Sequence, residues 1–307
     1  MTDLRLPTPA AELIPQSGLM RLIEELTDWT PDGARSRLVV DPGSPFVDAR
    51  GALDGLGLVE ILAQLAAASQ GYEAKRAKEP IRAGYLVGVK DFRLDGEVRA
   101  GDALRLEVRR SLHLEGVLVL QGEARVGDEQ VAGGTLKVWE QDGGFEPLSQ
   151  AHREVPARSK SLGNVRRDAW PDAWRDARSK ASLMRRGILD SLCLLEANES
   201  SGGAGSFRFA EDFLGFSGHF PGSPILPAVV MLEIGRTLGE LILKRPLAVT
   251  KISHAKFSQM IRPAEIVEAR VDIAPREAQS KKEVEIAVRL SRNESVAAKC
   301  HLIAAGR

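Results

Sequence analysis

The residues best suited to chemistry lie in one Gly- and Pro-rich loop and the helix that follows it. His219 stands within the run GFSGHFPGSPILP, which begins at Gly215, and Pro227 suits the first turn of the predicted helix. A helix N-terminus presents unpaired N–H groups that can polarise a carbonyl or hold a developing oxyanion. Glu233, on the same apolar helix, is costly to bury unless it is paired or functional. This segment therefore predicts either an acid–base site or a structural histidine and a paired carboxylate.

Metal chemistry has no support in the residue types and spacings. No two of the 5 histidines have the His-x-x-x-His spacing of a helical metal site. Cys193 and Cys300 are too few for a four-cysteine zinc site or a disulfide framework. We therefore predict no metal, and we expect structural or surface roles for the other histidines, which are His113, His152, His254 and His301.

Two long apolar segments predict the helices that would position the loop. Residues 55–76 and 228–244 carry apolar side chains at i, i+3, i+4 and i+7 with few charges, so each is predicted to be a largely buried helix. Alternation of apolar and polar residues predicts strands after each helix, with a further strand starting at Lys256. The alternating segments are residues 104–112, 117–126, 134–140, 267–274, 284–291 and 297–305.

The two halves of the chain repeat the same order of elements. Each has an apolar segment (residues 13–26 and 183–195), a Gly/Pro turn cluster, a buried helix and antiparallel strands. A sheet curled around one helix is an α+β arrangement with an exposed edge strand. Two units that pair edge to edge would cover that edge, so we predict a pseudo-dimer within one chain, and further homodimerisation stays open.

Length and composition indicate a two-domain protein. The 307 residues carry 42 basic and 42 acidic side chains, a balance that argues against a nucleic-acid-coating protein. No apolar stretch is long enough to span a membrane and no signal peptide is evident, so we expect a cytoplasmic protein without a membrane partner. We predict domains at residues 1–150 and 183–307, joined by a basic linker at 151–182. The stretch from Arg153 to Arg186, with ten basic and four acidic residues, is either a solvated connection or a docking strip for an acidic partner, tested at Arg166, Arg167, Arg185 and Arg186.

The second half carries a motif that is specific in both residues and spacing. The run GHFPGSPILPAVVMLE, from Gly218 to Glu233, resembles the active-site segment of the 3-hydroxyacyl-thioester dehydratases of fatty acid synthesis, which have the hotdog fold. In that family a histidine precedes an acidic residue by 14 positions, as His219 precedes Glu233. Downstream, AKFSQMIRPAE from Ala255 is similar to a family turn, although Ala and Glu replace its usual Gly and Asp. The resemblance implies a double hotdog fold.

The first half is similar to a divergent member of the same family, of the type found as a partner dehydratase in aryl-polyene pigment clusters. The runs LIPQSGLMRLIEELTDW, GLGLVEILAQLAAASQG and YLVGVKDFRLDGEVRAGD carry this resemblance. Aligning the two helices places Glu60 where Glu233 lies. Phe46 then stands where the histidine would be, so the first half has lost the base and kept the acid position.

This asymmetry implies one working site that both halves build. The family's histidine and acid come from opposite subunits, so the resemblance pairs His219 with Glu60, and leaves Phe46 facing Glu233. Gln64, four residues after Glu60, fills the position of a family glutamine that orients the acid, whereas Thr237 follows Glu233. Two alternatives stay open, namely that Glu60 is an exposed helix residue and that Glu233 is either the working acid or a structural vestige.

The resemblance implies dehydration of a (3R)-3-hydroxyacyl thioester to the trans-2-enoyl thioester, without a cofactor. His219 would remove the C2 proton and Glu60 would protonate the departing hydroxyl. The Ala228 N–H would bind the thioester oxygen, and the implied substrate-binding residues are Ala228, Gly222, Pro227 and Gln64. The acyl group would arrive on acyl carrier protein or CoA, in fatty acid, polyketide or aryl-polyene-type biosynthesis. Two alternatives are a thioesterase on the same fold and a non-catalytic partner of another dehydratase.

Overall fold

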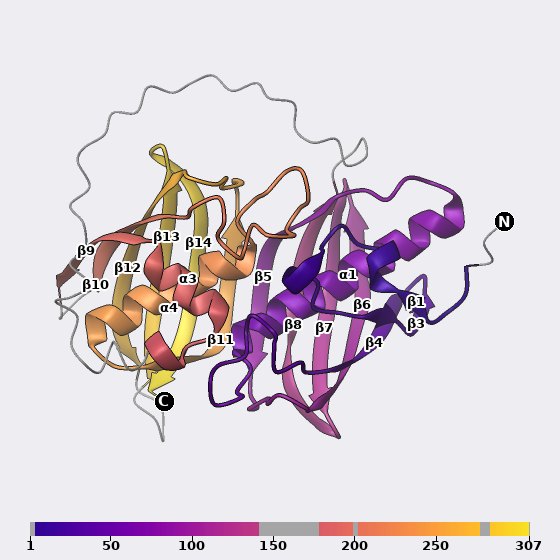
Figure 1. The fold of residues 1–307 in the computed structure, drawn as a ribbon, viewed down its shortest axis with the longest axis horizontal. Coiled ribbons are helices and arrows are strands. Elements are labelled where there is room, and N and C mark those ends of the chain that lie inside the picture. The colour runs from indigo at the N-terminus through magenta and orange to yellow at the C-terminus, as the bar shows by residue number, and fades with distance from the viewer. Residues whose placement is uncertain (1–3, 141–177, 199–201, 277–282, 307) are drawn as a thin grey trace.

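One antiparallel sheet of 12 strands carries helices on one side (Figure 1). The structure is a computed structural model that describes residues 4–140, 178–198, 202–276 and 283–306. Most of the predicted linker, residues 151–177, lies outside the described residues. The first half occupies the indigo-to-magenta side of Figure 1 and the second half the orange-to-yellow side.

In the first half the strands lie side by side in chain order, except for one early strand that pairs with the last. In sheet order they are β3 (Asp28–Thr30), β4 (Gly33–Val39), β6 (Ala103–Leu114), β7 (Val117–Val126), β8 (Glu129–Glu140) and β5 (Gly84–Leu94). A small separate pair is formed by β1 (Thr8–Pro9) and β2 (Glu25–Leu26), with the 3-10 turns Ala10–Glu12 and Gly18–Met20 between them.

The second half repeats this order in reverse across the sheet. Its strands are β11 (Leu247–Phe257), β14 (Ser295–Gly306), β13 (Glu283–Arg292), β12 (Ile266–Arg276), β10 (Gly202–Arg208) and β9 (Leu192–Asn198). The halves join where β5 pairs with β11, with Lys90 opposite His254. The edge that each half would expose alone is therefore covered by the other half.

Each half wraps its sheet around one long helix, as the sequence predicts. Helix α1 (Gly55–Ala77) is rich in good helix formers. The Asp54 side chain caps its start, and Lys78, which has the left-handed conformation, follows its last residue. Helix α4 (Ala228–Leu243) begins after Pro227, which provides no side-chain cap. A shorter helix, α3 (Leu183–Asp190), packs against α4.

Close packing holds α4 against its sheet. A Cβ placed on Gly235 would meet Val288 Cγ2 at 2.5 Å, so the backbone of α4 lies too near β13 for a side chain there. Apolar side chains of both helices and of the inner face of the sheet form one continuous core. Because α1 and α4 also contact each other, the two hotdog units share their interior rather than touching only through β5 and β11.

The predicted α+β double hotdog is confirmed, with local corrections. The six predicted strand segments lie within β6, β7, β8, β12, β13 and β14. The strand expected to start at Lys256 instead ends at Phe257, because β11 begins at Leu247. The short strands β4, β9 and β10 were not predicted, since glycines interrupt the alternation in β10 and only seven residues form each.

Candidate functional site

The loop that carries His219 is fixed from within its own half. The His219 N–H donates to the carbonyl of Phe216 at 3.2 Å, and Nδ1 lies 3.1 Å from the carbonyl oxygen of Ile225. A carbonyl oxygen can only accept, so Nδ1 carries the proton in the neutral ring and Nε2 is left with a free lone pair. The ring is buried, and its hydrogen bond sets both its orientation and its tautomer.

The same loop is also anchored to the first half. The backbone N–H of Ser17 donates to the carbonyl of Gly218 at 3.1 Å. Gly218 has a φ of +91°, and a Cβ there would collide with the Ser17 carbonyl oxygen, so only glycine suits this contact. The residue before His219 therefore docks on the half that carries Glu60.

Glu60 is held in α1 by the glutamine one helical turn later. Gln64 Nε2 donates to Glu60 Oε1 at 3.0 Å and to the Met20 carbonyl at 2.7 Å, while Gln64 Oε1 accepts from the Leu22 N–H at 2.8 Å. These backbone partners fix which end of the amide carries the nitrogen. Glu60 is 4% exposed, so the alternative of an exposed helix residue is wrong.

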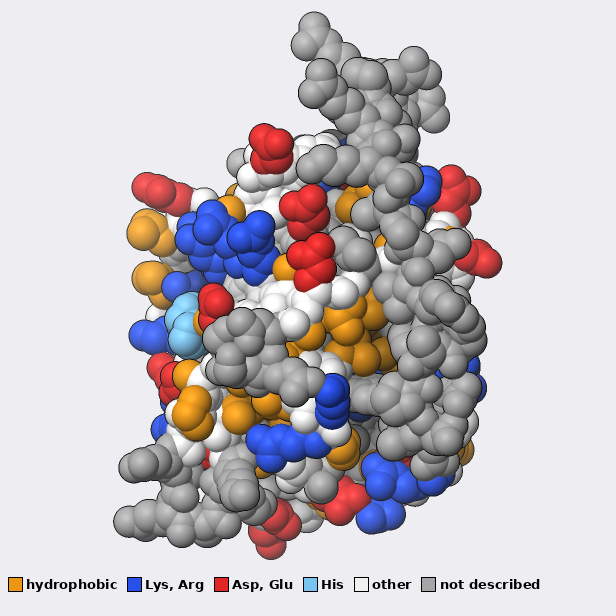
Figure 2. All heavy atoms as spheres, turned by 90° about the vertical axis from the view of Figure 1, so that its left-hand side faces the viewer, with side chains coloured by type: hydrophobic (Ala, Val, Ile, Leu, Met, Phe, Trp, Pro, Cys, Tyr) orange, Lys and Arg blue, Asp and Glu red, His pale blue; other side chains and the backbone are white. Residues whose placement is uncertain are grey.

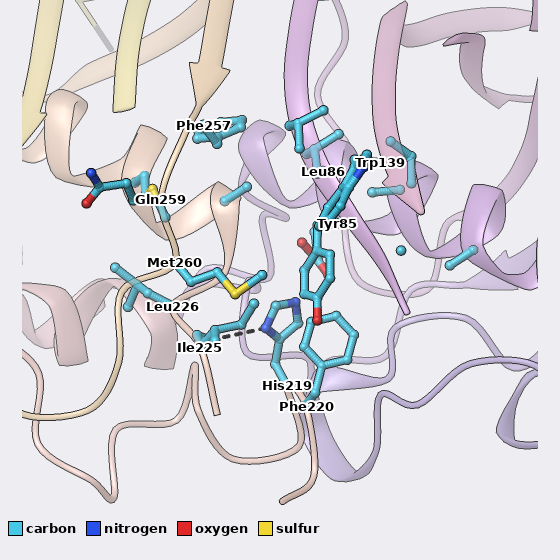
Figure 3. Close-up of a pocket in the computed structure, with 18 of the residues that line it drawn as sticks. Tyr85, Leu86, Trp139, His219, Phe220, Ile225, Leu226, Phe257, Gln259 and Met260 are labelled. Atoms are coloured by element: carbon cyan, nitrogen blue, oxygen red, sulfur yellow. Dashed lines mark hydrogen bonds between the residues drawn. The ribbon is translucent and has the colours of Figure 1, made fainter. Parts of the chain in front are cut away.

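His219 and Glu60 line one cavity between the two halves. This cavity has a volume of about 170 Å³ and takes its walls from both domains. Figure 3 shows His219 and Phe220 entering from the loop on one side, with Tyr85, Leu86 and Trp139 facing them from the strands of the other half. The predicted base and acid are thus brought together from residues more than 150 positions apart in sequence.

The other predicted site residues occupy three kinds of position. Ala228, the first residue of α4, lines the cavity, so the start of this helix faces the space between His219 and Glu60. Gln64 contacts Glu60 from behind. Gly222 and Pro227 are absent from the described residues that line the cavity, and their positions instead define the turn and the helix start.

Glu233 lies away from this cavity and is ion-paired. Among the described residues that line the cavity, Glu233 is not present. Its Oε2 lies 2.5 Å from Arg236 Nη2, and the same nitrogen lies 2.6 Å from Asp54 Oδ2. Burial raises the pKa of Glu233 to about 7; Arg236 and Arg185 oppose this effect, whereas Asp54 and Glu240 add to it.

An aromatic group at the cavity could not be identified from the sequence. Tyr85 stacks on Trp139 with centroids 5.9 Å apart and meets the edge of Phe220 at 5.5 Å. Burial raises the pKa of the Tyr85 phenol, so its hydroxyl stays protonated. These aromatic residues come from β5, β8 and the His219 loop, and only the pairing register of β5 with β8 brings Tyr85 opposite Trp139.

The basic stretch predicted as a docking strip is only partly described. Arg166 and Arg167 lie outside the described residues. Arg185 is not available to a partner, because its guanidinium is ion-paired with the buried Glu240. On the side of the molecule drawn in Figure 2, basic and acidic side chains are interspersed, with hydrophobic ones exposed between them.

Family comparisons divide the chain into two parts. The ApeP-like family, described as ApeP dehydratase, matches residues 8–150, and the ApeI-like family, described as ApeI dehydratase, matches residues 196–298. The chain is a tandem of two dehydratase-family domains. In this tandem dehydratase-family chain, the ApeP-like domain carries Glu60 and Gln64, and the ApeI-like domain carries His219.

Individual relatives of the tandem dehydratase-family chain are distant. The 3-hydroxyacyl-[acyl-carrier-protein] dehydratase FabZ of Pediococcus pentosaceus is 31% identical over 93 residues, which cover 28% of this chain and 61% of that relative. The dehydratase domain of RzxB from Pseudomonas fluorescens is 14% identical with a TM-score of 0.55, over 94% of this chain and 99% of that one. A putative oleoyl thioesterase from Lactobacillus plantarum is 10% identical with a TM-score of 0.57, over 89% and 95%. The structural likenesses concern the fold.

Neither a membrane-spanning helix nor a metal-binding cluster occurs among the described residues. No described helix is long and apolar enough to cross a membrane. Within the described ranges, no group of three or more His, Cys, Asp or Glu side chains is placed to hold a metal ion.

Proposed function

We propose that the cavity between the halves dehydrates a (3R)-3-hydroxyacyl thioester to the trans-2-enoyl thioester. One observation carries the proposal: His219 and Glu60, contributed by different halves, line the same cavity, and Glu233 is ion-paired elsewhere. The membership of both domains in dehydratase families supports this reaction over others that the fold can host.

His219 acts as the general base. Its Nδ1 is committed to the Ile225 carbonyl, so Nε2 takes the C2 proton, which the neighbouring thioester carbonyl acidifies. The electron pair of the broken C2–H bond forms the C2=C3 double bond. As negative charge grows on the thioester oxygen, the N–H of Ala228 at the start of α4 can stabilise it, an interaction typically worth about 3 kcal/mol.

Glu60 acts as the general acid. The C3–O bond breaks as the double bond forms, and Glu60 gives its proton to the leaving hydroxyl, which departs as water. The Gln64 amide, held by two backbone groups, keeps the Glu60 carboxyl aimed at the cavity. After release of the product, the proton taken by His219 returns to Glu60 through solvent or water in the site, and the pair is reset.

The cavity walls suit an acyl chain. Besides the reacting groups, side chains such as Leu226, Met231 and Val138 give the cavity an apolar lining, and Tyr85 and Trp139 provide aromatic faces. An apolar wall excludes water from the intermediate and favours the hydrocarbon part of the substrate. We propose acyl carrier protein as the carrier, with CoA as the competing source of the same thioester.

The test is dehydration of 3-hydroxyacyl thioesters on carrier protein and on CoA, followed by mass spectrometry for loss of water and by release of free thiol. Wild type would be compared with His219→Ala, Glu60→Ala and Glu233→Gln. We expect the first two variants to lose activity and Glu233→Gln to retain it. A required Glu233 would contradict the proposed site. Thiol release without enoyl product would indicate a thioesterase, and inactivity of wild type on every substrate would indicate a non-catalytic partner.

A further inference from the structure

A buried ion-pair cluster joins the start of α1 to α4, and none of its members lines the cavity of the proposed reaction among the described residues. Arg236 is 1% exposed, and its Nη2 bridges Asp54 Oδ2 at 2.6 Å and Glu233 Oε2 at 2.5 Å. Arg236 and Glu233 belong to α4, whereas Asp54 is the cap residue of α1. One guanidinium nitrogen therefore connects the first half to the second.

Asp54 makes this cluster a fixed point for the start of α1. Its Oδ1 accepts from the N–H of Leu56 at 3.1 Å, which caps the helix. Its own N–H donates to the carbonyl of Phe46 at 2.9 Å. With Oδ2 bound to Arg236, the carboxylate has one oxygen on its own helix and the other on the helix of the partner domain.

The helices joined in this way are the two that position the proposed catalytic groups. Glu60 lies in the second turn of α1, and the loop of His219 leads directly into α4. A sliding or tilting of α1 against α4 would change the separation of acid and base. Misplacement of a reacting group by about 1 Å can reduce a rate about a hundredfold.

We propose that Arg236 is a positioning residue, which sets the start of α1 against α4 and thereby the placement of Glu60 relative to His219. This inference rests on the proposed function. A buried ion pair is seldom a net source of stability, since well-packed apolar residues often serve as well or better. A buried charged contact does, however, select one arrangement, because any other leaves charges unpaired inside the protein.

The decisive variant replaces the whole cluster by neutral residues of similar size. Arg236→Met alone leaves two buried carboxylates without their cation, which destabilises the fold, so the triple variant Asp54→Asn, Glu233→Gln, Arg236→Met is the main test. Asparagine caps helices as well as aspartate, so the α1 cap is kept. The matched control is Arg185→Met with Glu240→Gln, which removes the neighbouring ion pair between α3 and α4; its charges also act on Glu233 and Arg236, but the pair leaves the contact of Arg236 with Asp54 at the start of α1 in place.

The readouts separate positioning from stability. For the triple variant we expect a Tm close to wild type, a KM within about twofold, and a kcat lower by about ten- to a hundredfold. The control pair should keep the wild-type kcat. Arg236→Lys, which retains the charge, should keep a larger part of kcat than the triple variant does. A triple variant with wild-type kcat would overturn the inference.

A second readout does not depend on catalysis. Hydrogen exchange of the amides at residues 55–60 should be faster in the triple variant than in wild type and unchanged in the control pair, because only the triple variant frees the start of α1. If wild type dehydrates no thioester, the proposed function fails while this exchange still decides whether the cluster holds α1. Unchanged exchange at residues 55–60 would overturn the positioning role in either case.

Discussion

The two composite sites of this chain share a backbone scaffold. Phe46 lies nine residues before the start of α1 at Gly55, and His219 lies nine residues before the start of α4 at Ala228. The loop of Phe46 is docked on the second half by an N–H of Met184 that donates to the Pro45 carbonyl at 2.9 Å. The loop of His219 is docked on the first half by the equivalent bond from Ser17 to Gly218, at 3.1 Å.

The difference between the two sites lies in the side chains. Phe46 packs over Gly57 of α1 in the place of a base. The start of α1 is capped by the Asp54 carboxylate, whereas α4 begins without a side-chain cap. Arg236 neutralises Glu233, where the neutral amide of Gln64 holds Glu60.

The loop of the second composite site still joins the two halves through a backbone hydrogen bond. The position of the base holds Phe46, the start of α1 is capped by Asp54, and the acid Glu233 is present but ion-paired with Arg236. The two places therefore differ in a few side chains rather than in their backbone.

The largest effect should follow from removing the base. His219→Ala leaves no group at this position that can take the C2 proton, and we expect kcat to fall by about 10³-fold or more. The measurement is the initial rate of enoyl formation at saturating substrate. His113→Ala, in which the histidine lies in β6 outside the catalytic cavity, is the matched control and should keep wild-type kcat. A His219→Ala rate within tenfold of wild type would assign the base elsewhere.

A smaller effect should follow from loosening the acid. Gln64→Leu keeps the side-chain size but removes the amide that holds Glu60, so we expect kcat to fall by about tenfold. Thr237→Val, at the equivalent position of α4, should leave kcat unchanged, because the Thr237 hydroxyl makes no hydrogen bond among the described residues. Equal losses in both variants would mean that helix packing, rather than orientation of Glu60, controls the rate.

A stability effect without a catalytic one is expected at Glu233. Its pKa is raised from 4.5 to about 7 in the folded protein, so the native state binds more protons than the unfolded state between these values. The contribution to stability is therefore present below pH 4.5 and is lost as the pH rises through about 7.

Glu233→Gln should remove this pH dependence while keeping kcat. The measurement is denaturant unfolding at a series of pH values, with the free energy of unfolding of wild type compared with that of the variant. Glu233 is surrounded by Arg236, Asp54, Arg185 and Glu240, whose pairing is kept in the variant except for the contact with Arg236. A difference between wild type and variant that does not change with pH would contradict the pKa assigned to Glu233.

The smallest effect is expected from restoring a histidine to the second site. In a His219→Ala background, Phe46→His should give no measurable dehydration. The start of α1 stays capped by Asp54 and the acid stays paired with Arg236, so a base alone cannot rebuild the site. Activity regained in this double variant would show that the loss of the base alone separates the two sites.

The fold could be predicted from sequence because helical periodicity and strand alternation are local patterns, whereas the pairing of His219 with Glu60 came from the family resemblance. Helical periodicity located α1 and α4, and the spacing within the His219 loop carried the family resemblance. The shared order of elements in both halves then predicted that the two halves pair edge to edge in one sheet.

The other contacts between the halves could not be predicted, since they depend on which residues meet after the halves assemble. Arg236 is one charged residue in an apolar helix, and nothing in its neighbourhood in sequence indicates Asp54 as its partner. The same holds for the bond from Ser17 to Gly218 and for the contact of Tyr85 with Phe220. Arg185 was expected at a docking surface, but tertiary packing places it against Glu240.

In the proposed function one chain builds one working site from its own two halves, and mixing of two inactive variants tests this most directly. His219→Ala and Glu60→Ala chains would be unfolded together, refolded as a mixture, and assayed for dehydration beside each variant refolded alone. We predict that the mixture is as inactive as its components, because every chain lacks either His219 or Glu60. Recovery of a substantial fraction of wild-type activity would contradict it, since the base and acid would then come from different chains.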